Sequence, residues 1–436
     1  MKRSMLIAAA AILGLTSVIL AVPAGADGES AAADEIAWAA CPPGDPFLEN
    51  AECADVSVPL DYRKPNGRKI SIAVSRVRHT APDSEYQGVL LANPGGPGGG
   101  GLFLSGGLAS WLPAEVAATY DIIGFDPRGV GSSTPALTCD PDYADPVRPD
   151  YVPASAREEL AWIAKSKNYA EACAEKFGWL LPHLRTTDAA RDIDAIRTAL
   201  GADKINYYGF SYGTYLGATY GTLFPNRVNR MVLDGNVDVR GVWYENQLEQ
   251  DKAFERNIKL YFAWIAEHDS VYHLGTTGAA VERAYYDLRD RAERNPIGGK
   301  VGPAELDDTL LTAGYTVAWY ERQAEALAAV INDGDPAPLV ALYDDFIAAS
   351  DDNGFAMYLG VQSADAGWPR KWRTWHDDAV KLYDAGIVFE TWGNVWFNAP
   401  AAFWPVDGGP ELRINGRGMP PALLVQSTLD AATPYP

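Results

Sequence analysis

The chain has 436 residues, of which 47% are hydrophobic and 21% charged, so it contains enough apolar material for a large folded core. Its formal net charge of −21 repels phosphate backbones and anionic lipid surfaces, and this excludes nucleic acid as an expected partner. Its length permits one large domain or several smaller ones.

Residues 1–26 have the three parts of a secretory signal peptide. Lys2 and Arg3 are basic, residues 5–22 form an apolar run, and Ala24-Gly25-Ala26 offers small side chains at a cleavage site. We expect cleavage after Ala26 and a secreted, extracellular protein without membrane contact. An uncleaved anchor is the alternative, because the apolar run is nearly long enough to span a bilayer.

The four cysteines are expected to form disulfide bonds, because export permits them. Four cysteines allow three pairings, and we favour the pairing that closes local loops, Cys41 with Cys53 and Cys139 with Cys173. A zinc site is the alternative, but no two cysteines have the close spacing of zinc ligands and no histidine is near them. We expect neither a metal nor a cofactor.

Short apolar runs alternate with helical patterns from residue 27 to residue 238. Such alternation is typical of a parallel sheet that is covered by helices on both faces. Strands are predicted over 56–60, 70–77, 88–92, 120–125, 205–210 and 228–233, and helices over 186–200 and 212–223.

Helical patterns then replace the alternation from residue 239 to residue 405, before a short apolar strand at 422–426. Helices are predicted over 252–267, 279–295 and 310–331. We therefore expect an α/β fold with a mostly parallel sheet flanked by helices. Its core is formed by residues 27–238 and 406–436, and residues 239–405 are inserted as a helical cap.

The segment Gly209-Phe210-Ser211-Tyr212-Gly213 has the pattern of a nucleophile elbow. Such a sharp turn between a strand and a helix lifts the serine Oγ above the sheet, and its glycines let strand and helix approach each other. A predicted strand precedes the segment and a predicted helix follows it, as the motif requires. The pattern predicts Ser211 as a nucleophile, with a purely structural turn as the alternative.

A second glycine-rich segment, residues 93–101, follows an earlier predicted strand. It lacks the Gly-Lys-Ser/Thr of a phosphate-binding loop, and Pro94 and Pro97 make it too stiff for a linker. Its backbone N–H groups suit one half of an oxyanion hole, with the Tyr212 N–H as the other half.

These two motifs and the intervening Gly124–Ser132 segment resemble those of the secreted tripeptidyl aminopeptidases of actinomycetes, in the prolyl-aminopeptidase-like branch of the α/β-hydrolases. Residues 58–62, 232–235 and 424–435 extend the resemblance over nearly the whole mature chain. It implies a serine exopeptidase that releases short peptides, tripeptides in this family, from free N-termini through an acyl-enzyme on Ser211.

The resemblance also implies roles for single residues. Gly95 and Tyr212 would donate the oxyanion hydrogen bonds, and Asp430 would be the triad acid that orients a histidine. Asp126 and Arg128 fit the turn of this family, where we favour a structural role that ties loops together.

The triad histidine is where the sequence departs from the family pattern. The fold has the chain order serine, aspartate, histidine, yet all five histidines precede Asp430. We expect a natural protein that continues beyond Pro436 with a histidine and a closing strand, and we regard His376 as a disfavoured substitute. Without a base Ser211 is a weak nucleophile, so a catalytically inactive fold used for binding is one alternative.

An exopeptidase also needs a carboxylate that holds the free amine of its substrate. Glu245 and Glu249 are candidates, because they follow the strand that ends at Asp234. A solvated helix face is the alternative for each. The expected partner is a peptide substrate and a monomer is favoured, while an esterase that acts on small esters is the alternative activity.

Overall fold

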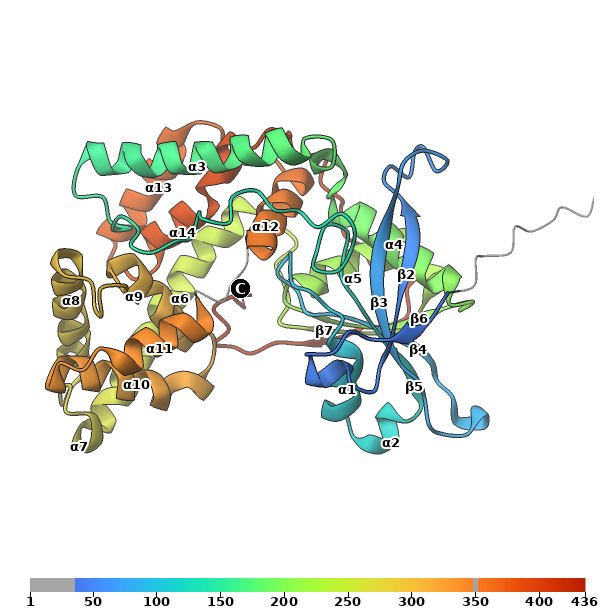
Figure 1. Cartoon of the computed structure of the whole chain (residues 1–436), viewed down its shortest axis with the longest axis horizontal. Coiled ribbons are helices and arrows are strands. Elements are labelled where there is room, and N and C mark those ends of the chain that lie inside the picture. Colours follow the sequence, from blue (N-terminus) through green and yellow to red (C-terminus); the bar gives the residue numbers. More distant parts are fainter. Residues whose placement is uncertain (1–35, 348–351, 436) are drawn as a thin grey trace, which may run out of the picture. The chain divides into compact units, whose positions relative to one another are not determined.

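One eight-stranded sheet runs through the part of the chain that this computed structural model describes, residues 36–347 and 352–435 (Figure 1). The predicted signal peptide lies outside these residues. The strands have the spatial order β1-β2-β3-β5-β4-β6-β7-β8. They are β1 (Ala39–Ala40), β2 (Glu52–Pro59), β3 (Lys69–Val77), β4 (Gly88–Asn93), β5 (Tyr120–Phe125), β6 (Ile205–Phe210), β7 (Val228–Asp234) and β8 (Leu423–Val425).

Strands β1, β2 and β3 pair with one another in antiparallel orientation, and β3 also pairs antiparallel with β5. The other five strands, β5, β4, β6, β7 and β8, are mutually parallel. Carboxyl ends of parallel strands meet at one edge of a sheet, and ligands of open α/β sheets bind outside that edge. The structure therefore confirms a mostly parallel sheet.

Both faces of the sheet are covered, which explains the continuously apolar strands. Leu91 and Ile123 belong to the cluster that contains residues of α4 and α5, whereas Leu90 and Ile122 pack with Leu104 of α1. The helices outside the cap region are α1 (Leu104–Trp111), α2 (Ala114–Ala117), α3 (Ala156–Phe177), α4 (Thr186–Ala199) and α5 (Tyr212–Leu223).

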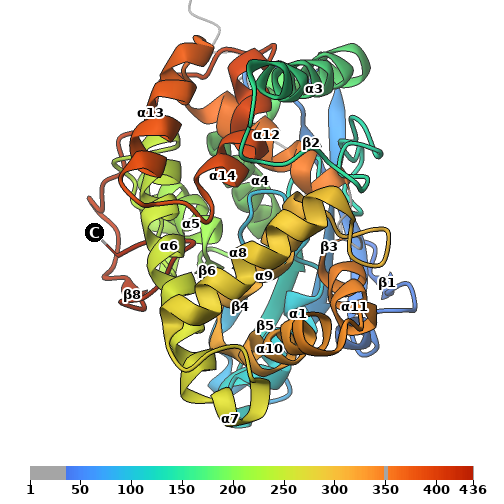
Figure 2. The same ribbon diagram turned by 90° about the vertical axis from the view of Figure 1, so that its left-hand side faces the viewer.

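Nine α-helices lie between β7 and β8 within the described residues, and Figure 2 shows several of them from the side that faces away from the sheet. They are α6 (Tyr244–Glu267), α7 (Asp269–Tyr272), α8 (Gly278–Arg294), α9 (Pro303–Tyr315), α10 (Tyr320–Ala328), α11 (Ala337–Phe346), α12 (Asp352–Asp365), α13 (Trp372–Asp384) and α14 (Thr391–Asn398). No helix in the described ranges is both long and apolar enough to cross a membrane.

The helix predicted over 310–331 is interrupted. Thr316 has extended backbone angles, and its side chain accepts a hydrogen bond from the Ala318 amide. A threonine side chain that bonds to nearby backbone competes with helix formation in this way. The segment is therefore divided into α9, a short 3-10 turn and α10.

Helix α3 is not among the helices predicted above. It packs beside the cap helices α13 and α14 (Figure 1). Trp162 of α3 stacks on Trp396 of α14, with ring centroids 5.5 Å apart. Ser155 caps the helix by accepting from the Glu158 amide. This Ser-x-x-Glu pattern is a helix-start signal that could have revealed α3.

Both predicted disulfides are confirmed. Cys41 is bonded to Cys53, and Cys139 to Cys173. The first bond fixes the short edge strand β1 next to β2, and the second connects the segment after β5 to α3.

Candidate active site

Ser211 occupies a sharp turn between β6 and α5. Its φ of +53° and ψ of −126° form a combination that residues other than glycine rarely adopt. The turn is held by hydrogen bonds from the Ser211 amide to the Asp234 carbonyl (2.9 Å) and from Thr214 Oγ1 to the Ser211 carbonyl (2.6 Å). A Cβ added to Gly209 would lie 2.3 Å from the Gly213 oxygen, so the strand and helix are too close for a side chain there.

The glycine-rich segment after β4 lies against this turn, since β4 and β6 are neighbours in the sheet. A Cβ added to Gly95 would lie 2.8 Å from Ser211 Cβ and 3.0 Å from Tyr212 N. The Gly95 amide itself donates to Asn93 Oδ1 at 3.0 Å. Gly95 thus shapes the space beside the nucleophile, but its N–H is already engaged.

The next residue, Gly96, has an amide that is not engaged in this way. Gly96 lines both cavities that Ser211 lines, and its amide has no hydrogen bond to any described residue. The amide of Tyr212, at the first position of α5, is likewise unpaired within the described ranges. Sequence reasoning identified this loop but chose Gly95, because only the folded loop shows which amide Asn93 engages.

Asp430 follows β8 and lies near the same turn. Thr433 holds its carboxylate with two hydrogen bonds of 2.8 Å, from the amide to Oδ1 and from Oγ1 to Oδ2. A Cβ added to Gly235 would lie 3.5 Å from Asp430 Oδ2 and 3.8 Å from Ser211 N. Ser211 follows β6 and Asp430 follows β8, and both lie near Gly235 at the end of β7, the strand between them.

Ser211 lies where two cavities meet, a smaller one of about 330 Å³ and a larger one of about 650 Å³. Both volumes are in the range of about 300–1,000 Å³ that is typical of small-molecule sites. The smaller cavity includes polar side chains of α6, among them Gln247. The larger one has several aromatic and aliphatic walls, formed by Phe254, Leu311, Phe355, Trp396 and Phe397.

The two predicted amine anchors are exposed on α6. Glu249 lines the smaller cavity but forms an ion pair of 2.6 Å with Lys252, and Glu245 lines neither cavity. Glu390, which the sequence analysis did not single out, is buried in the wall of the larger cavity. Glu390 lies at the start of a helix, and the residues around it in the sequence do not indicate that it lines a cavity.

All five histidines lie within the described residues, and none lines either cavity. His376 Nδ1 is 2.8 Å from Glu159 Oε1 of α3, and the ring packs near Trp392. This position gives His376 a structural contact away from Ser211.

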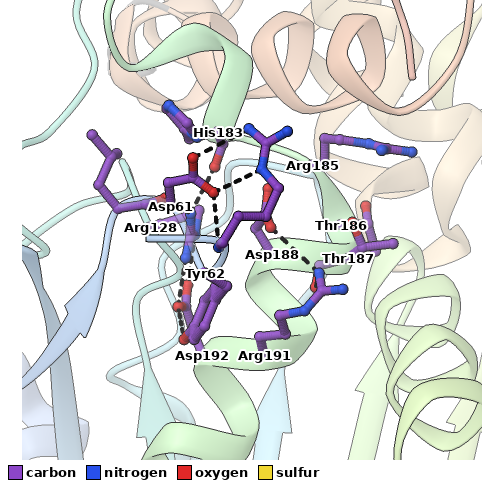
Figure 3. A network of polar contacts seen from close by, with 12 residues as sticks. Asp61, Tyr62, Arg128, His183, Arg185, Thr186, Thr187, Asp188, Arg191 and Asp192 are labelled. Atoms are coloured by element: carbon purple, nitrogen blue, oxygen red, sulfur yellow. Dashed lines mark hydrogen bonds and ion pairs between the residues drawn. The ribbon is translucent and has the colours of Figure 1, made fainter. Parts of the chain in front are cut away.

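Arg128 and Asp126 connect loops beneath the site. Figure 3 shows the Arg128 guanidinium directed at Asp192, to which it donates at 2.7 and 2.6 Å. Tyr62 donates to the same carboxylate at 2.7 Å. Asp126 accepts from the Gly101 amide at 2.7 Å, and burial raises its pKa. The Asp126 contact holds the end of the glycine-rich segment in place, whereas the Arg128 contacts connect the turn after β5 to α4.

Two protein-family models match parts of the chain. Residues 88–289 match the family model of the alpha/beta hydrolase fold, and residues 388–436 match that of TAP-like proteins. A tripeptidyl aminopeptidase of Streptomyces coelicolor is 44% identical over 95% of this chain and 76% of its own length. That of Streptomyces lividans is also 44% identical, over 95% and 77%.

A more distant relative is the serine protease Hip1 of Mycobacterium tuberculosis, which is 31% identical over 92% of this chain and 81% of its own length. The chain thus belongs to the tripeptidyl aminopeptidase family of α/β-hydrolase-fold serine hydrolases.

Proposed function

We propose that the protein is an exported serine exopeptidase that releases short peptides, tripeptides by analogy with its Streptomyces relatives, from free N-termini. The observation that carries this proposal is the placement of Ser211 on a strained turn, beside two unpaired amides and at the junction of two cavities. One cavity can hold the acyl part of a peptide and the other its leaving part. The signal-like N-terminus and two disulfides support export.

In the proposed reaction Ser211 Oγ gives its proton to a base and attacks the scissile carbonyl. The C–N bond breaks and the amine of the departing peptide takes up that proton, which leaves an acyl-enzyme that water then hydrolyses. The amides of Tyr212 and Gly96 would stabilise the negative oxygen of the tetrahedral intermediate, where losing one donor typically costs about 10²–10³ in rate. Asp430 is proposed as the acid that orients a histidine base, a role that none of the five histidines described above fills, since none lines the cavities at Ser211. Gly95 is proposed to shape the hole next to its donors.

Three substrates test the proposal: a free-amine tripeptide anilide, its N-acetylated form and a nitrophenyl ester. An exopeptidase should cleave the free-amine anilide and leave the acetylated one almost intact. Equal cleavage of both anilides would eliminate the exopeptidase mode, and cleavage of the ester alone would identify an esterase. Sedimentation of the purified chain checks the expected monomer.

A further inference from the structure

Glu390 is a buried carboxylate without a partner among residues 36–347 and 352–435. It lies at the start of α14, is 9% exposed and lines the larger cavity together with Ser211. Its carboxylate accepts no hydrogen bond and forms no ion pair with any described residue. A Cβ added to Gly393 would lie 3.3 Å from Glu390 Oε1, so the absence of a side chain at Gly393 leaves the carboxylate room.

The other three carboxylates that line this cavity already have partners. Asp308 accepts from Arg148 Nη2 at 2.6 Å and from the Tyr151 hydroxyl at 2.9 Å. Asp352 accepts from the Tyr169 hydroxyl at 2.6 Å and from backbone amides. Asp140 accepts from a backbone amide at 3.3 Å. Glu390 is thus the one acidic side chain of this wall whose hydrogen-bonding capacity is unused within the described chain.

The surroundings of Glu390 favour a cation. Burial raises its pKa well above the usual range, and the nearby carboxylates Asp308, Asp251 and Asp307 raise it further. The guanidinium of Arg148, which also lines the cavity, is engaged by Glu305 and Asp308. A buried carboxylate in an acidic environment is compensated by a charged donor far better than by a neutral one.

We propose that Glu390 binds the free α-ammonium group of the substrate while the scissile carbonyl lies at Ser211. This assignment rests on the proposed exopeptidase activity and deepens it. Both groups line one cavity, so the distance between them determines how many residues are released, at about 3.3–3.6 Å per extended residue. The aromatic walls of the cavity would receive the side chains. Glu245 and Glu249 are exposed, and an ion pair in water contributes little to affinity.

The test measures peptide binding, because binding does not depend on turnover. Ala-Ala-Ala amide and its N-acetyl form are titrated by calorimetry into the full chain carrying Ser211→Ala. The free-amine peptide should bind at least about tenfold more tightly, as for a desolvated charge pair. Adding Glu390→Gln should abolish this preference and leave binding of the acetylated peptide unchanged.

Glu267→Gln is the matched control, since Glu267 is an exposed residue of α6 that lines neither cavity. It should keep the full preference. A preference that survives Glu390→Gln overturns the assignment and leaves the proposed function intact. Loss of the preference in Glu249→Gln instead would transfer the role to α6 and also overturn it.

Equal binding of the free-amine and acetylated peptides by the Ser211→Ala chain that keeps Glu390 would refute both the exopeptidase mode and the Glu390 assignment. This outcome differs from a preference that survives Glu390→Gln, which refutes the assignment alone. If Glu390→Gln abolishes binding of both peptides, Glu390→Asp decides the question. The aspartate keeps the charge and should retain a weakened preference for the free amine. Equal binding of the two peptides by that variant would overturn the proposal.

Discussion

Gly95→Ala tests the packing of the glycine-rich segment against the nucleophile turn. The new Cβ would lie 2.6 Å from the Phe210 oxygen, 2.8 Å from Ser211 Cβ and 3.0 Å from Tyr212 N. Gly95 also has a φ of +102°, which costs a non-glycine residue about 1–3 kcal/mol. The backbone on one side of the hole must therefore move, and a misplacement of about 1 Å can cost about 10²-fold in rate.

The measurement is the rate at which a fluorophosphonate labels Ser211, since that reaction uses the same oxyanion contacts. We expect Gly95→Ala to slow labelling by about 10²–10³, the cost of losing one oxyanion donor. Gly367→Ala is the control, because an added Cβ there meets nothing within 4 Å. Its labelling rate should not change. If Gly95→Ala labels as fast as the parent chain, the loop does not form the hole.

The candidate site residues can be proposed from the sequence where their signal is local. Gly209, Ser211 and Gly213 are needed within one turn, so five consecutive residues contain the motif. Asp430 lies just after a short strand at the same sheet edge. The alternation of strands and helices also predicts the parallel sheet, because each element carries its own periodicity.

What the sequence did not reveal depends on contacts between distant segments. Residues 95 and 96 are both glycines, so the sequence does not distinguish their amides. Only the fold shows that the Gly95 amide donates to Asn93. Glu390 is far along the chain from Ser211, and it is buried next to α14, whose Trp392, Val395 and Trp396 belong to the main core cluster. Patterns of hydrophobicity contain no information on which carboxylates find partners.

Three further changes test other parts of the structure. Asp192→Asn leaves Arg128 buried without its anion and should lower the free energy of unfolding in urea by about 3–5 kcal/mol, whereas Asp377→Asn, in an exposed pair with Arg373, should change it by less than about 1 kcal/mol. His376→Ala should leave the fluorophosphonate labelling rate of Ser211 unchanged, and a large decrease would identify His376 as the base. Burial raises the pKa of Asp251 to about 7. The folded chain then holds a proton more tightly than the unfolded chain, so this group makes stability fall as pH rises from about 4 to about 7. Asp251→Asn removes the titration and can still accept from Asn394. Its free energy of unfolding relative to the parent should therefore increase between pH 4.5 and pH 8, by about 3 kcal/mol, and a constant difference across that range would show that Asp251 is ionised throughout.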